Sequence, residues 1–292
     1  MSKNSTAELL KELDDKIENV KSSEEVQEIL DFFSKFHKYS YNNTLLIQMQ
    51  YPDATHVAGY RQWKDKFNRH VKKGEQGIAI LAPFTYTDKE TEVRKVVTAS
   101  GDIEEKEIEK KIKKTYFNPV YVFDISQTEG KPLPELDTSI SDTKSKLLYP
   151  CLAFAKNNNI SVEFNALVRG HEGYCRRDKI VVDKSLNATE KASVLLHELS
   201  HILLHHLDIS AESEPINSPE YNNLSSNEYL SREIKELEAE STAYVVMDYF
   251  GVRLKSHRYL SLYRKSYNLS NSLSRIKFIS SKMISFIEEL IT

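Results

Sequence analysis

The segment LLHELSHILLHH, residues 195–206, most strongly constrains what this chain can fold into. It is apolar enough to form a buried helix, yet it places His197, Glu198 and His201 in the order HExxH. Residues i and i+4 lie on one face of a helix, so the two imidazoles can approach one cation. The segment predicts either a metal-binding helix or an ordinary core helix that holds two histidines.

Two neighbouring features favour the metal-binding interpretation. Asn187, with Glu190 three residues later, is an N-cap signature that places HELSH in the middle of its helix. Ionisable groups on a buried helix also need partners or a metal. We therefore expect His197 and His201 to bind Zn²⁺, with Glu198 beside them as general base. Zn²⁺ in such a site lowers the pKa of water to about 7.

A catalytic zinc site needs a third protein ligand. The longer pattern HExxHxxGxxH is absent, because leucines stand where its glycine and last histidine are required. The segment KELEAESTAYVV, residues 235–246, offers carboxylates on a second helix. We expect Glu236 to bind the metal and Glu240, on the same face, to accept a hydrogen bond from a ligand histidine. Glu238 points to a different face and is the alternative ligand.

Composition and charge narrow the class of protein. The chain has 292 residues and a net charge of −3, which allows two domains and excludes a uniformly basic nucleic-acid binder. No apolar run approaches the ~20 residues that span a bilayer, so no membrane partner is expected. The N-terminus has no secretory signal, and Cys151 and Cys175 are expected to be free thiols. These features predict a cytoplasmic protein.

The hydrophobic pattern predicts an α+β chain of two domains. The first domain, residues 1–130, should hold N-terminal helices and a small antiparallel sheet, whose strands are Ile78–Ala82, closed by Pro83, and residues 119–125. The charged run 88–114 is expected to be a solvated, mobile insertion at a hairpin tip and not a binding element. A polar linker with two prolines follows at residues 131–144.

The second domain, residues 145–292, should be mostly helical with a small sheet. Its expected elements are a helix over 145–156, strands at 160–164 and 179–183, the HELSH helix, a helix over 227–250 and two terminal helices. We expect strand 179–183 to bind an extended substrate by edge pairing.

This second half resembles the ImmA/IrrE-type zinc metallopeptidases over roughly residues 145–292. The resemblance rests on LLHELSHILLHH and on KELEAESTAYVVMDYFG, which is similar to the ExxA(D/N/E) helix motif of that family. It implies a zincin-like (gluzincin) fold, a protein or peptide substrate, and Zn²⁺ held by His197, His201 and Glu236. Glu198 then corresponds to the catalytic base.

The N-terminal half is locally basic, with eight Lys or Arg and three Asp or Glu between Lys35 and Pro83. Aromatic residues are interleaved with these cations, a combination typical of single-strand binding. The alternative is that Trp63 and several tyrosines are core residues and the lysines solvated surface. The candidate DNA-binding residues are Asn42, Asn43, Arg61, Trp63, Lys72 and Lys73.

Residues 39–83 and 121–134 resemble the N-terminal domain of ArdC-type antirestriction proteins. The resemblance rests on YSYNNTLLIQMQYPDATHVAGYRQWKDKFNRHVKKGEQGIAILAP and YVFDISQTEGKPLP. It implies a single-stranded-DNA-binding module in front of a metallopeptidase domain, in the context of a mobile genetic element. A non-proteolytic DNA-binding antirestriction protein with a structural metal site is the alternative, and both share the same ligands.

Overall fold

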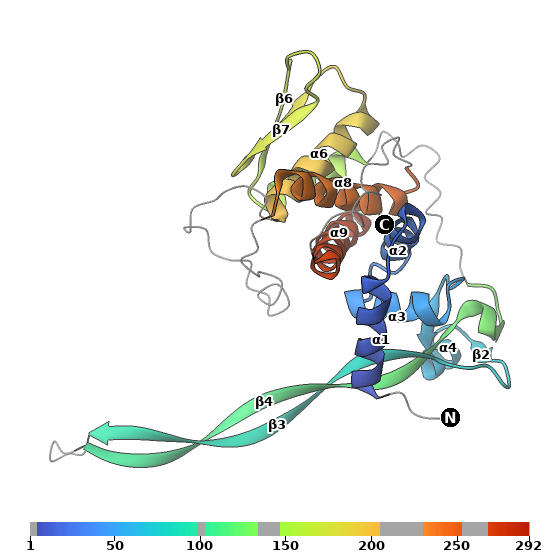
Figure 1. Ribbon diagram of the computed structural model, residues 1–292, viewed down its shortest axis with the longest axis vertical. Helices are drawn as coiled ribbons and strands as arrows, with labels where there is room; N and C mark the ends of the chain where they lie inside the picture. The colour runs from blue at the N-terminus through green and yellow to red at the C-terminus, as the bar shows by residue number, and fades with distance from the viewer. Residues whose placement is uncertain (1–4, 98–102, 134–146, 205–229, 253–267, 292) are drawn as a thin grey trace.

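The computed structural model describes residues 5–97, 103–133, 147–204, 230–252 and 268–291. A long two-stranded ribbon projects from an N-terminal group of helices and short strands, and the C-terminal helices lie on the opposite side of that group (Figure 1). None of the helices in these ranges is both long and apolar enough to cross a membrane.

The N-terminal half alternates short helices with strands. Its elements are α1 (Thr6–Glu18), α2 (Ser23–Lys35), α3 (Tyr41–Gln50), β1 (Val57–Gly59), α4 (Tyr60–Asp65), β2 (Arg69–Val71), β3 (Ile78–Val97), β4 (Ile103–Asp124), η1 (Ile125–Gln127) and β5 (Thr128–Gly130). β1, β4 and β3 form an antiparallel sheet, and β2 pairs with β5. The predicted helices with a small antiparallel sheet are confirmed.

The C-terminal half is mostly helical, as predicted. Its elements are α5 (Leu148–Asn157), β6 (Ser161–Asn165), β7 (Gly173–Arg176), β8 (Lys179–Asp183), α6 (Ala188–Leu203), α8 (Arg232–Tyr249) and α9 (Leu269–Ile291). Asn187 caps α6 in a capping box with Glu190, as the sequence predicts. The first of the two expected terminal helices, and most of the expected linker, lie outside the described residues.

The strand order corrects one expectation about the substrate. β8 pairs with β6 on one side and with β7 on the other, so it is the central strand of its sheet. A central strand has no unpaired backbone groups and cannot add an extended peptide. Among the described strands, the one with an open edge beside α6 is β7, which is not among the strands expected from the sequence.

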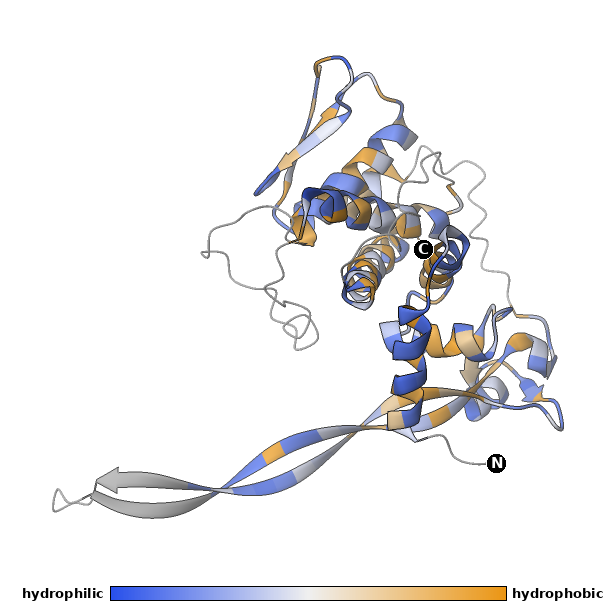
Figure 2. Ribbon diagram, viewed as in Figure 1, coloured by the Kyte–Doolittle hydropathy of each residue, from blue (hydrophilic) through white to orange (hydrophobic). Residues whose placement is uncertain are grey.

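The prediction for the charged run is correct in its exposure and its place in a hairpin, but wrong in making it a mobile insertion, because β3 and β4 are paired from Ile78–Val122 to Val97–Ile103. The described side chains make cross-strand contacts, such as Thr85 with Thr115 at 3.1 Å and Lys89 with Glu109 at 2.9 Å. A ribbon with water on both faces can be as polar as a loop, and its hydropathy changes from apolar to polar away from the base (Figure 2).

Pro83 does not end the strand, and helix α3 explains why. The amide oxygens of Gln50 and Asn43 accept the N–H groups of Ala79 and Leu81 at 2.8 Å each. These N–H groups therefore point away from β4, so Ala79 and Leu81 occupy non-hydrogen-bonded pairs. Pro83, two residues further, belongs to the same set, and it needs no N–H for the ladder.

One hydrophobic core joins the two halves of the chain. It contains Leu9, Leu13 and Leu30 of the N-terminal helices together with residues of α6, α8 and α9. Tyr244 of α8 donates a hydrogen bond to Asp31 of α2 at 2.7 Å. The polar linker of the sequence therefore does not separate two independent cores.

Two buried cations hold α9 in this core. Arg275 and Ser272 bind the carboxylate of Glu238 on α8, which is fully buried, and the Arg275 Nε lies 3.3 Å from it. Lys277 donates to the carbonyls of Phe36 and His37 at 3.1 and 3.2 Å, where α2 ends. Burial lowers the pKa of Lys277 to about 7.

Arg275→Met should destabilise the chain by about 3–5 kcal/mol, because it leaves the Glu238 carboxylate buried without its charge partner. Urea denaturation followed by circular dichroism measures the difference. Arg232→Met on exposed α8 surface is the control and should stay within about 0.5 kcal/mol of wild type. An Arg275→Met variant as stable as the control would contradict a structural role for the pair.

Candidate metal centre

Helices α6 and α8 pack against each other and bring three metal-binding side chains together. His197 and His201 lie one turn apart on α6, and Glu236 lies in the first half of α8. The ligand atoms of these three residues all lie within 4.8 Å of one another. No second group of this kind occurs among the described residues.

The distances between donor atoms fit one divalent cation. The Nε2 atoms of His197 and His201 are 3.0 Å apart. Glu236 Oε2 lies 3.4 Å from the His197 nitrogen and 3.6 Å from that of His201. Donors around a tetrahedral cation at about 2.1 Å are themselves about 3.4 Å apart. The donor set therefore fits without rearrangement of either helix.

The carboxylates and imidazoles of this group shift one another's pKa values in the direction that favours a positive charge beside a negative one. Burial lowers the pKa of His197, but the carboxylates of Glu236, Glu198 and Glu240 raise it more strongly, so the pKa lies above its usual value. The two histidines in turn hold the pKa of the Glu236 carboxyl well below its usual range. A carboxylate is thus available as a ligand at neutral pH.

A cleft of about 920 Å³ gives access to this site. Its lining includes His197, Glu198 and Glu240, together with residues 167–172 between β6 and β7 and with Gly173 at the start of β7. The His197 side chain is 27% exposed and that of Glu236 is 50% exposed. An open side of this kind is what a catalytic metal site requires and a closed structural site lacks.

Glu198 lies between the cleft and the strand β7. Its residue is only 9% exposed, and it lines the cleft next to His197. A Cβ built on Gly173 would lie 2.5 Å from Val194 Cγ1 and 3.5 Å from Glu198 Cγ. Only glycine lets β7 approach α6 this closely, a requirement that the sequence interpretation did not recognise.

Cys175 of β7 is a second neighbour that the sequence interpretation did not identify. Burial raises the pKa of its thiol, and the charge and hydrogen bond of Glu198 raise it further. Cys175 is therefore a neutral thiol beside the Glu198 carboxylate. No local pattern could have indicated it, because the contact depends on how β7 packs on α6.

The three glutamates of α8 that the sequence analysis considered have different surroundings. Glu236 faces the histidines. Glu238 instead binds Arg275 and Ser272 in the core, so it is not available as the alternative ligand in this structure. Glu240 lines the cleft near His197 and contributes to the raised pKa of that residue. Its hydrogen bond to a ligand histidine remains a prediction.

The structure corrects the prediction for Trp63. Its side chain is 1% exposed, and its Nε1–H donates to the carbonyl of Phe123 at 2.8 Å. A ring enclosed in this way presents no face on which a base could stack. Trp63 is a core residue of the N-terminal half, the alternative that its sequence context left open.

The remaining candidate DNA-binding residues lie in different environments. Arg61, Lys72 and Lys73 are exposed, although Lys72 Nζ also donates to the Ser126 carbonyl at 2.8 Å. The side-chain amide of Asn43 donates a hydrogen bond to the carbonyl of Leu81 on β3 and accepts one from its N–H. The sequence did not indicate this structural role. Asn42 is half-buried on the first turn of α3, and its role stays a prediction.

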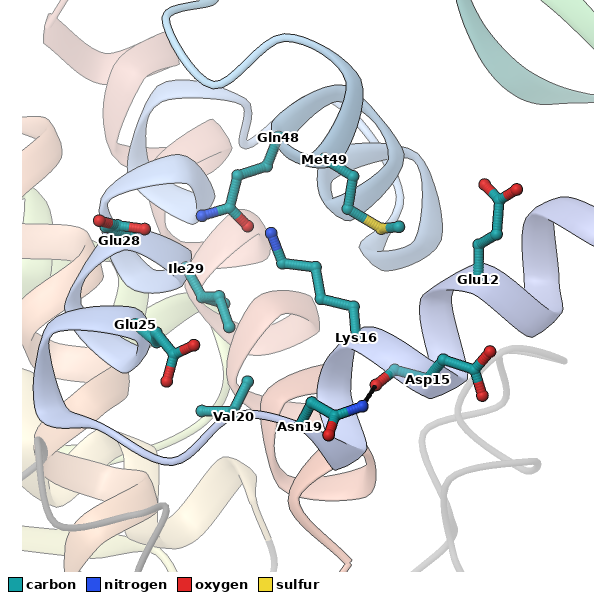
Figure 3. A pocket seen from close by; sticks show the side chains of 10 residues that line it. All are labelled: Glu12, Asp15, Lys16, Asn19, Val20, Glu25, Glu28, Ile29, Gln48 and Met49. Atoms are coloured by element: carbon teal, nitrogen blue, oxygen red, sulfur yellow. Dashed lines mark hydrogen bonds between the residues drawn. The ribbon is translucent and has the colours of Figure 1, made fainter.

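A second cavity, of about 480 Å³, lies between α1, α2 and α3 (Figure 3). Lys16 extends into it toward Gln48, and the carboxylates of Glu12, Asp15 and Glu28 lie around it. Glu25 is engaged with the backbone N–H groups that precede α2. The acidic side chains surround a lysine already in place and form no group suited to a metal.

Comparison with known proteins assigns each half of the chain. Residues 1–123 match the family described as the N-terminal domain of anti-restriction factor ArdC. Residues 159–274 match the family described as the IrrE N-terminal-like domain. The chain thus joins a segment similar to the ArdC N-terminal domain to one similar to the IrrE-like domain. Both resemblances predicted from the sequence are confirmed, and the three candidate metal ligands all fall in the IrrE-like domain.

A relative with both parts occurs in Bacillus anthracis. This uncharacterised protein is 28% identical over 280 residues, which cover 86% of the chain and 44% of the relative. The chain thus spans less than half the length of that protein.

Two crystal structures of the antirestriction protein ArdC from plasmid R388 are also similar. The metal-free form has 17% identity and a TM-score of 0.41, covering 86% of each chain. The Mn(II)-bound form has 15% identity and a TM-score of 0.42, covering 86% of this chain and 84% of the other.

The geometry of the IrrE-like domain predicts how each residue affects metal binding. His197→Ala or His201→Ala should abolish stoichiometric binding of a divalent metal, and Glu236→Gln should weaken it strongly, because each removes a donor. Glu240→Gln should weaken it about 10–100-fold. Competition with a chromophoric chelator measures the affinities.

Glu238→Gln is the matched control, since it should reduce stability but leave metal binding per folded chain unchanged. A larger loss of affinity in Glu238→Gln than in Glu236→Gln would show that the assignment of ligands on α8 is wrong.

Proposed function

We propose that this chain is a zinc-dependent endopeptidase joined to a single-stranded-DNA-binding domain, and that it acts in the cytoplasm in the antirestriction functions of a mobile genetic element. The observation that carries the proposal is the position of Glu198, one residue after a metal-binding histidine and facing an open cleft. The family of the N-terminal domain supports the antirestriction context.

Zn²⁺ suits two imidazoles and one carboxylate, and when bound it supplies Lewis acidity that polarises a peptide carbonyl and acidifies water. His197, His201 and Glu236 would hold it between α6 and α8. Glu198 would accept a proton from the attacking water and deliver it to the leaving amine. Cys175, neutral beside Glu198, would help to keep that carboxylate oriented toward the cleft.

The substrate would be a protein segment in extended form. β7 pairs with β8 on one side only, so its other edge has backbone groups that a peptide strand can bind. Gly173, the first residue of β7, lies against the helix that carries Glu198. A peptide added to this edge would therefore pass next to the general base.

The DNA-binding part of the proposal rests on exposed cations of the ArdC N-terminal domain. Arg61, Lys72 and Lys73 are exposed on α4 and on the turn that precedes β3. Cations at these positions can contact phosphates without reading the bases, so binding would depend on salt more than on sequence.

A non-proteolytic protein is the second candidate. The three metal-binding residues come from two packed helices, so a metal could also serve to fasten α6 to α8. In that case the DNA-binding half would carry the whole biological function. A metal with a purely structural role requires no general base, so Glu198 distinguishes the two candidates.

Glu198→Gln should reduce cleavage by about 10²–10⁴-fold, because glutamine keeps the shape of the side chain but cannot accept the proton. Proteome-wide mapping of new N-termini in cells that express the wild type or the variant measures cleavage. Protection of incoming plasmid DNA in a restricting host measures the biological effect.

Metal content, melting temperature and DNA binding should remain at wild-type values in Glu198→Gln, which separates loss of chemistry from loss of structure. If the variant protects plasmid DNA as well as the wild type does, the peptidase proposal is refuted and the structural role of the metal is favoured.

The double variant Lys72→Gln, Lys73→Gln should bind a thymidine oligonucleotide more weakly than the wild type does. The slope of log K against log salt should fall by about 0.7 for each phosphate contact that is lost. Fluorescence anisotropy of the full chain at several salt concentrations provides both values. Lys184→Gln, an exposed lysine of the IrrE-like domain, is the control and should leave the slope unchanged.

A further inference from the structure

The two faces of the β3–β4 ribbon differ in charge. Paired residues are both odd-numbered or both even-numbered, and alternate residues of a strand point to opposite faces, so each face holds one parity. Within residues 83–92 and 109–121, the odd face has Lys89, Lys111 and Lys113 against Glu109, a net charge of +2. On the even face, Lys110 and Lys114 stand against Asp88, Glu90 and Glu92, a net charge of −1.

The side chains of the even face contact one another across the two strands. Phe84 stacks on Tyr116 with ring centroids 5.7 Å apart, and Tyr86 contacts Tyr116 edge-on at 5.8 Å. Further along, Lys114 lies 2.7 Å from Asp88 and 3.2 Å from Glu90. These cross-strand contacts stabilise the ribbon and leave no excess positive charge on this face.

The odd face presents separate rings and cations along one strand. Phe117 is 52% exposed and Tyr121 is 46% exposed, and Lys111 and Lys113 follow them toward the tip. Tyr60, at the start of α4, is 58% exposed and continues the line through an edge contact with Phe123 at 6.3 Å. We call Tyr60, Tyr121, Phe117, Lys113 and Lys111 the β4 strip.

We propose that the β4 strip binds single-stranded DNA lengthwise, with bases stacked on its rings and phosphates on its lysines. This proposal rests on the proposed function of the ArdC N-terminal domain and names where the strand lies. From Lys111 to Tyr121 the strip measures about 34 Å, which corresponds to roughly ten stacked nucleotides. Exposed rings on a face with a net charge of +2 fit a polyanion with π faces better than they fit an apolar protein surface.

The strip explains how the domain binds a strand although Trp63 is enclosed in the core. The exposed cations Lys72 and Lys73 precede β3 at the base of the ribbon, so they lie at the opposite end of β4 from Lys111. A strand that begins near the base would then follow β4 outward, away from the IrrE-like domain (Figure 1).

The experiment compares the two faces of the ribbon in the full chain. Phe117→Leu with Tyr121→Leu should weaken binding of a thymidine oligonucleotide of about 20 nucleotides by roughly tenfold or more. Lys111→Gln with Lys113→Gln should reduce the salt slope by about 1.4, or 0.7 for each lysine. The matched controls on the even face are Tyr86→Leu and Lys110→Gln, which should bind as the wild type does. Melting temperatures verify that each variant is folded.

Each outcome has a distinct meaning. If the wild type does not bind the oligonucleotide, the proposed DNA-binding function fails and this inference fails with it. If the wild type binds and the strip variants bind equally well, only the β4 strip is refuted. Equal losses on both faces would also refute it. Strip variants that keep DNA binding but lose protection of plasmid DNA would show that this face docks a protein instead.

Discussion

The buried ion pair between Glu238 and Arg275 determines how the candidate site is assembled. A carboxylate enclosed in a core is strongly destabilising unless its partner is held in place, so the pair favours the register of α8 on α9 in which Glu238 faces Arg275. That register turns Glu236, two residues earlier, toward His197 and His201 on α6. The ion pair in the core thus helps to determine which carboxylate of α8 faces the two histidines.

The shared hydrophobic core has a consequence for the two domains. Helix α2 of the ArdC N-terminal domain contacts α8 and α9, and Lys277 of α9 binds the carbonyl groups where α2 ends. Removal of either half would expose this apolar surface, and removal of the N-terminal half would also take away the two carbonyl acceptors of Lys277. The β3–β4 ribbon and the candidate metal centre are therefore parts of one packed structure, although they match separate families.

The errors of the sequence interpretation have physical causes. The run 88–114 has the composition of a loop, because a ribbon solvated on both faces needs no apolar alternation. Pro83 suggested a strand end, but Asn43 and Gln50 show that its backbone position carries no ladder bond. Trp63 lies among cations in the sequence, yet its ring packs inward. In each case a contact with a distant segment decided the outcome.

The sequence by itself determined the helix that carries the site, because caps, the 3.6-residue period and the HExxH spacing are all local. It also indicated Glu236 and the two domain families. Only the tertiary structure decided that Glu238 is excluded, that β7 and not β8 offers an open edge, and that Cys175 lies beside Glu198. These features depend on how separate elements pack, and packing energies are sums over contacts that no local pattern records.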